Sequence, residues 1–197
     1  MPPRALRNPL SLVALGLLAE QPLHPYRMRA LLRERGHDRI VKGSGASLYD
    51  SVARLTAAGL VEIQESVRDG RRPERTVYRI TAGGLHALQG WVREALADPE
   101  LQDQFTAALS FMYVVPRAEV VALMSQRMTA LNALIDTSGA AIGDALHAGV
   151  PPIFLSEEHY NQAQLRSQLD WLDAFTAQLR DGQLSWPQPR PTTERQP

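Results

Sequence analysis

Residues 44–80 read SGASLYDSVARLTAAGLVEIQESVRDGRRPERTVYRI, and their hydrophobic period changes partway along. From about Gly45 to Ala58 the apolar residues recur at helical spacing, and Gly59 is a typical helix stop. Apolar and polar residues alternate from Val61 onward, which is typical of a strand. The turn-forming DGRRPE follows, and Thr76–Ile80 has the composition of a return strand. A helix followed by a basic hairpin predicts a winged helix, whose helix enters the major groove of DNA while the hairpin tip reaches phosphates.

Helices are predicted on both sides of this segment. Asn8 to about Glu20 begins with an Asn N-cap and a Pro at the first helical position. A second helix starts at Pro25 and stops at Gly36. Thr81 is expected to cap a further helix, whose apolar face is Leu85, Leu88, Val92 and Leu96.

The second half of the sequence predicts only helices. One covers about 102–113, and a second begins at Pro116. Glycines and a serine between 138 and 143 leave open whether residues 116–149 form one helix or two. Ser156 is expected to cap the last helix. The expected fold is mainly α: a winged-helix domain over residues 1–97, an all-α dimerisation domain over 98–182, and a disordered tail over 183–197.

The net charge of zero hides an asymmetry between the two halves. Residues 1–85 hold 14 basic and 8 acidic residues, a net charge of +6, and residues 86–197 hold 7 and 13, a net charge of −6. All the basic residues except Lys42 are arginines, which bind phosphate and guanine edges with two parallel hydrogen bonds. A basic half on a neutral chain indicates a polyanionic partner.

Several classes of protein are disfavoured by the sequence. There is no cysteine, so disulfides and thiolate sites are excluded, and a reducing compartment fits. No P-loop, HExxH or GxSxG motif is present, and no two histidines have helical metal-site spacing. We therefore expect no enzyme, no cofactor and no metal. The basic, apolar N-terminus has the outline of a short signal peptide, but Asn8-Pro9 favours a helix start and a cytoplasmic protein.

The chain resembles the PadR family of bacterial transcriptional regulators. The matching pieces are LVALGLLAEQPLHPYRM, GSGASLYDSVARLTAAGLV and GRRPERTVYRITAGG, which cover most of residues 9–88. The family usually has Gly where this chain has Pro25, and often an acidic residue where it has Ala82. The resemblance implies a homodimeric repressor on a roughly palindromic DNA operator, with a helical C-terminal dimerisation region. Some family members respond to phenolic acids or bulky aromatic drugs.

The candidate DNA-binding residues lie on the second and third helices and on the hairpin: Tyr26, Ser44, Ser47, Tyr49, Arg54, Arg71, Arg72 and Arg75. Tyr49 follows the inward-facing Leu48, so it either contacts DNA or packs under the wing. Ser44 and Ser47 either bind phosphate at the helix N-terminus or simply cap it. Arg54 either contacts DNA or pairs with Asp50 one turn earlier. The three hairpin arginines are expected on the phosphate backbone or in the minor groove, although surface arginines are usually only solvated.

Trp91 on the fourth helix is either a core residue or one wall of a site for a planar aromatic effector. The apolar stripes over Val120–Ile135 and Leu165–Leu179 predict a homodimer, because stripes that long are rarely left exposed. The alternative function is a winged-helix module that binds acidic protein partners without reading DNA. A DNA-binding regulator should still prefer its own DNA sequence over random DNA at physiological salt, whereas a protein-binding module should show no such preference.

Overall fold

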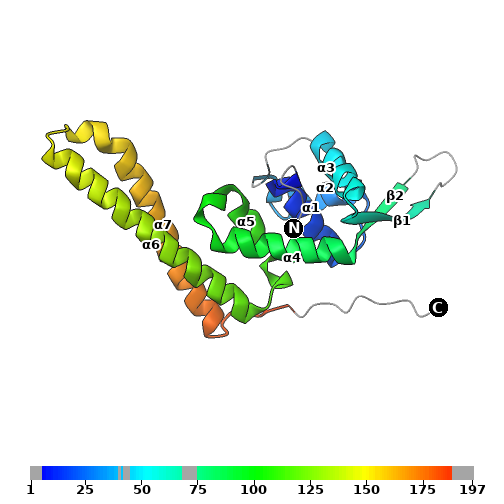
Figure 1. The fold of residues 1–197 in the computed structure, drawn as a ribbon. Helices are drawn as coiled ribbons and strands as arrows, with labels where there is room; N and C mark the ends of the chain where they lie inside the picture. The colour runs from blue at the N-terminus through cyan, green and yellow to red at the C-terminus, as the bar shows by residue number, and fades with distance from the viewer. Residues whose placement is uncertain (1–5, 40, 42–44, 68–74, 188–197) are drawn as a thin grey trace. The chain divides into compact units, whose positions relative to one another are not determined.

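The computed structural model describes residues 6–39, 41, 45–67 and 75–187. The described chain is mainly helical with one two-stranded antiparallel sheet, which confirms the predicted fold class (Figure 1). Its elements are α1 (Pro9–Glu20), α2 (Pro25–Glu34), η2 (His37–Arg39), α3 (Gly45–Ala57), β1 (Val61–Val67), β2 (Arg75–Ile80), α4 (Ala82–Ala97), η3 (Pro99–Leu101), α5 (Gln102–Phe111), η4 (Met112–Val114), α6 (Arg117–His147), η5 (Pro152–Leu155) and α7 (Ser156–Arg180).

The chain packs as two compact units. The first contains residues 1–95 together with 101–115, and the second contains 96–100 together with 116–186. Helix α5 therefore packs with the winged-helix segment, whereas the expected boundary at residues 97/98 placed it in the C-terminal domain. The packing of α1 is the physical reason, because α5 covers one side of that helix.

Helix α1 is the centre of the first unit. The Asn8 side chain accepts a hydrogen bond from Ser11 N at 3.0 Å, as expected of an N-cap. Residues 10–18 are all buried, so the helix is apolar around its whole circumference rather than along one stripe. Contacts with α3, β2 and α5 cover it. None of the described helices is both long and apolar enough to span a bilayer.

The wing is a hairpin in which β1 pairs with β2 from Val61–Ile80 to Val67–Arg75. The register shifts between Ile63 and Glu65, so the simple alternation expected from the sequence is interrupted there. Leu23 forms a bridge to Tyr78, with both backbone hydrogen bonds at 2.9 Å. The start of β1 and the end of β2 thus lie near the helices, and the hairpin extends away from them (Figure 1).

A polar cluster joins the C-terminal ends of α1 and α2 to η4. The Glu20 carboxylate accepts two hydrogen bonds from Arg35, both at 2.7 Å, and one from the Tyr113 hydroxyl at 2.8 Å. Burial raises the pKa of Glu20, but the hydrogen bonds from Arg35 and Tyr113 outweigh it and leave the pKa below its ordinary value of 4.5. Burial and the bond to Glu20 raise the pKa of Tyr113, so this phenol stays protonated and donates.

His37 lies beside this cluster and is 7% exposed. Its ring packs on Phe111 with centroids 5.7 Å apart, and Nδ1 has no hydrogen-bond partner among the described residues. Burial and the neighbouring Arg35 lower the pKa of His37 below 6.5, against the opposing effect of Glu20 and Asp38. His37 is therefore held neutral in the folded protein.

The second unit is built on the antiparallel pair α6 and α7. Helix α6 is continuous from Arg117 to His147, so the glycines near residue 140 do not divide it. The expected cap at Ser156 is wrong: Leu155 holds the N-cap position, and Ser156 Oγ donates back to the Ile153 carbonyl at 2.8 Å. The chain enters α7 from η5, so Ser156 is already helical.

Arg127 is fully buried in this unit. Its Nη1 donates to the Asp98 carbonyl at 2.6 Å and its Nε to Gln168 Oε1 at 3.3 Å. Burial lowers the pKa of Arg127 to about 10, which still leaves the group charged at neutral pH. Arg127, which lies on α6, thus links Asp98, the residue after α4, to both α6 and α7.

Two helical glycines give a matched test of the α1–α5 contact. A Cβ at Gly16 would overlap the Phe111 ring, which is itself buried, whereas a Cβ at Gly90 meets nothing within 4 Å. We expect Gly16→Ala to lower the free energy of unfolding by about 1–3 kcal/mol through overpacking. Gly90→Ala should raise it by about 0.4–1 kcal/mol by restricting the unfolded chain. Urea denaturation of both variants measures this, and a neutral Gly16→Ala would contradict the contact.

The buried neutral His37 predicts a pH dependence of stability. Its folded pKa lies below the unfolded value of 6.5, so the unfolded chain takes up a proton first as pH falls. This contribution to stability is complete above pH 6.5 and is lost below it. The contribution of Glu20 is lost only below pH 4.5. Between these two values, the free energy of unfolding should fall less steeply with decreasing pH in His37→Gln than in the parent protein, and equal slopes would refute the assignment.

Candidate nucleic-acid interface

Helix α3 presents two faces of different chemistry. Leu48, Val52 and Leu55 are buried, at 2% exposure or less, and pack toward the core. Tyr49 is 47% exposed and Arg54 is exposed on the other side. Arg54 forms a long hydrogen bond to Ser51 Oγ at 3.4 Å, and among the described residues none to Asp50. The helix therefore exposes an aromatic ring and a guanidinium on the side away from the core.

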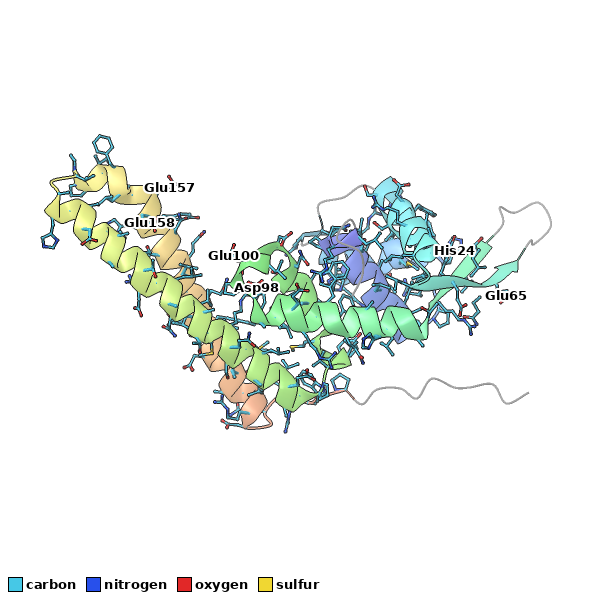
Figure 2. All side chains as sticks on the ribbon, viewed as in Figure 1. His24, Glu65, Asp98, Glu100, Glu157 and Glu158 are labelled. Carbon is cyan, nitrogen blue, oxygen red and sulfur yellow. The ribbon has the colours of Figure 1, made fainter. Side chains whose placement is uncertain are left out.

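Helix α2 packs against α3 and adds a second exposed surface. Tyr26, at its first turn, is 71% exposed. The sequence did not reveal that His24 caps this helix: Nδ1 accepts from Tyr26 N at 3.0 Å (Figure 2). The cap fixes the backbone that carries Tyr26. Arg29 and Arg33, which the sequence analysis did not single out as candidates, are exposed on the same helix.

The N-terminal end of α3 is only partly described. Ser47 lies in its first turn and is half-buried. Ser44 lies outside the described residues. The choice between phosphate binding and capping for these two serines stays a prediction.

The wing carries the remaining candidates. Arg75 is the first residue of β2 and pairs with Val67, while Arg71 and Arg72 lie outside the described residues. Nearer the base of the hairpin, Arg79 and Glu62 face each other across the strands at 2.7 Å. Both side chains are about half exposed, so this pair adds little to stability.

Trp91 lies in the interior of the first unit. Its side chain is fully buried, and the indole N–H donates to Gln104 Oε1 on α5. Gln104 is itself 7% exposed. A core residue has this burial, and the indole nitrogen, which is the one polar atom of the ring, has a hydrogen-bond partner. A ligand would reach the ring only by opening the contact between α4 and α5.

No group of three or more His, Cys, Asp or Glu within the described ranges has metal-site geometry. Glu157 and Glu158, which stand next to His159 in the sequence, lie in the first turn of α7 (Figure 2). Ser138 Oγ donates to Glu158 Oε1 at 2.7 Å, which ties this turn to α6. Acidic side chains in a first turn are stabilised by the helix dipole.

The solved structures that resemble the chain include two of Bacillus subtilis PadR and one of a Streptococcus mutans protein. Bacillus subtilis PadR in complex with operator DNA has a TM-score of 0.41 and 20% identity, over 86% of this chain and 98% of that one. The Streptococcus mutans protein smu.1604c has a TM-score of 0.41 and 19% identity, over 85% and 98%. Bacillus subtilis PadR in complex with p-coumaric acid has a TM-score of 0.39 and 18% identity, over 88% and 99%. No curated protein matches the chain.

The family comparison concerns the segment that holds most of the candidate interface. Residues 14–90 match the model of the transcriptional regulator PadR-like family. This range runs from α1 through α2, α3 and the wing into α4. Its match confirms the resemblance drawn from the sequence motifs. Residues 14–90 are therefore similar to the PadR-like family of transcriptional regulators.

Proposed function

We propose that this protein is a homodimeric repressor that binds a roughly palindromic operator in the cytoplasm and leaves it when a small aromatic effector binds. The observation that carries the proposal is the outward face of α3. Tyr49 and Arg54 are exposed there although the helix buries Leu48 and Val52 within the same turns. Exposed aromatic and guanidinium groups on a groove-entering helix supply both phosphate contacts and base contacts.

The candidate residues are assigned to different parts of the DNA according to the chemistry of their side chains. Tyr49 and Arg54 on α3 are assigned to the major groove and its edge. Tyr26, through its exposed side chain at the start of α2, and Ser44 and Ser47 at the start of α3 are assigned to phosphates, because the dipole at a helix N-terminus favours anions. The wing residues Arg71, Arg72 and Arg75 are assigned to the phosphate backbone. The net charge of +6 over residues 1–85 supports the assignment.

Selection from a random duplex library tests this function directly. The full chain should enrich one sequence with two inverted half-sites, and should keep a large preference for it over random DNA at about 0.15 M salt. A winged helix that binds only protein would enrich no sequence, and its weak attachment to DNA would vanish at this salt concentration.

The dimer proposal rests on the two faces of the α6–α7 pair. Met124 and Leu131 on α6, and Leu172 and Leu179 on α7, are buried and repeat at seven-residue spacing. On other faces Leu134 is 40% exposed and Trp171 is 44% exposed. Trp171 stacks on Phe175 with centroids 4.8 Å apart, which gives a flat aromatic surface. Such surfaces on a 31-residue and a 25-residue helix suit a second copy of the chain.

We expect the protein to sediment as a dimer at micromolar concentration, and Leu134→Glu with Trp171→Glu to shift it toward monomer. Two carboxylates placed on apolar surface must be desolvated for the dimer to form. Thr129→Glu with Gln178→Glu adds the same charge at exposed polar positions of the same helices and should leave the dimer intact. A monomeric parent protein would contradict the proposal.

The wing assignment predicts a loss of affinity without a change in specificity. Arg71→Ala with Arg72→Ala should weaken binding to the selected operator and to random DNA about equally, since phosphate contacts carry little sequence information. Each lost contact should lower the slope of log affinity against log salt by about one unit. The control pair Arg166→Ala and Arg180→Ala removes the same charge from α7. A double wing variant that kept its affinity but changed its preferred sequence would show that the wing reads bases.

Effector release is tested with p-coumaric acid, the ligand of the Bacillus subtilis structure described above. A ligand beside Trp91 should quench its fluorescence and release the operator over the same concentration range, because it favours a dimer form that does not match the DNA. Trp171 and Trp186 also emit, so the titration is repeated with Trp91→Phe. Quenching that persists in Trp91→Phe, or binding without release, would contradict a site at Trp91.

A further inference from the structure

The segment formed by α5 and η4 lies outside the residues that match the family model, yet it packs in the same compact unit as the helices of the candidate interface. Phe111 fits against Gly16 of α1, where there is no room for a Cβ. Gln89 of α4 donates to the Val114 carbonyl at 3.1 Å. Two elements of the winged-helix segment thus hold this part of the chain in place.

From this segment Tyr113 reaches the end of α2. Its hydroxyl donates a hydrogen bond to the Glu20 carboxylate. The same carboxylate accepts one hydrogen bond from Nη1 and one from Nη2 of Arg35. Arg35 is the C-cap residue of α2, and its backbone N–H is bonded to the Leu31 carbonyl at 3.0 Å. A bidentate pair fixes the direction of both partners, which a single hydrogen bond does not. Tyr113 holds the carboxylate in the orientation that this pair requires.

The turn that follows Arg35 leads toward α3. Gly36 adopts a positive φ of 70°, and His37 then packs its ring on Phe111. Val41 N donates to the His37 carbonyl at 2.9 Å, and both side chains are buried. The same short segment therefore supports this turn on two sides: Phe111 by ring contact, and Tyr113 by the carboxylate that holds Arg35.

We propose that Tyr113 is a positioning residue for DNA recognition: through Glu20 and Arg35 it fixes the C-terminal end of α2, which packs against α3, and so the placement of α3 on its operator. The inference rests on the proposed function, because it assigns α3 to the major groove. Base contacts depend on the exact placement of a helix, whereas phosphate contacts tolerate small displacements. Loosening the turn therefore costs operator affinity and spares affinity for random DNA.

Tyr113→Phe removes the hydroxyl and keeps the ring. We expect it to weaken binding to the selected operator about fivefold, on the order of one hydrogen bond, with little change for random DNA and an unchanged salt slope. Tyr160→Phe is the matched control, since the Tyr160 hydroxyl accepts a hydrogen bond from Gln164 at 2.8 Å on the exposed surface of α7. Glu20→Gln should lose operator affinity as well, and combining it with Tyr113→Phe should add little.

Amide hydrogen exchange supplies a measurement that needs no DNA. In Tyr113→Phe, exchange should quicken at Arg35 and Gly36, whose amides bond to carbonyls in the last turns of α2, and at Arg39 and Val41, whose amides bond to Gly36 and His37. It should stay unchanged in α6 and α7. The proposal is overturned if these four amides exchange at the same rate in Tyr113→Phe as in Tyr160→Phe. Equal losses on operator and random DNA overturn it too. If the parent protein selects no operator, the proposed function fails, and the exchange result alone then decides whether Tyr113 holds the turn.

Discussion

The need to cover α1 on every side shapes the first unit. A helix whose residues 10–18 are all buried cannot rest on a single neighbour, because each exposed apolar side chain would forgo about 1.5–3 kcal/mol of burial. The winged-helix segment supplies α3 on one side and β2 on another. The remaining side is closed by α5, which comes from beyond the end of α4. The packing unit consequently extends to residue 115, past the range of the family match.

Local signals predicted the elements that carry the candidate interface. The Asn8 and Thr81 caps depend on side chains, and the stops at Gly36 and Gly59 on a positive φ, within three residues of a helix end. The burial of Leu48 and Val52 follows from helical spacing alone, and so does the exposure of Tyr49 between them. These features need no knowledge of the rest of the chain, so the sequence contains them fully.

Features that depend on residues far apart in the sequence were not predicted. The bond from Tyr113 to Glu20 spans 93 positions, and nothing in either neighbourhood marks the other. The packing of α5 against α1 was not predicted for a similar reason: Asp98-Pro99 ends the preceding helix, but a break in secondary structure need not be a break in packing. The wrong prediction of a cap at Ser156 also comes from the preceding segment. Because η5 leads directly into α7, Ser156 already has a helical conformation, and its hydroxyl donates to the Ile153 carbonyl.

The junction after α3 has a mechanical consequence. Thr81 accepts a hydrogen bond from Gly84 N and donates to the Gly59 carbonyl, while its backbone N–H bonds to the Leu60 carbonyl. That carbonyl lies so close to Gly84 that a Cβ there would overlap it. Gly59 and Leu60, between α3 and β1, and the first turn of α4 are therefore held together at the foot of the wing. A movement of the first turn of α4 would therefore have to carry Gly59 and Leu60 with it or break these hydrogen bonds.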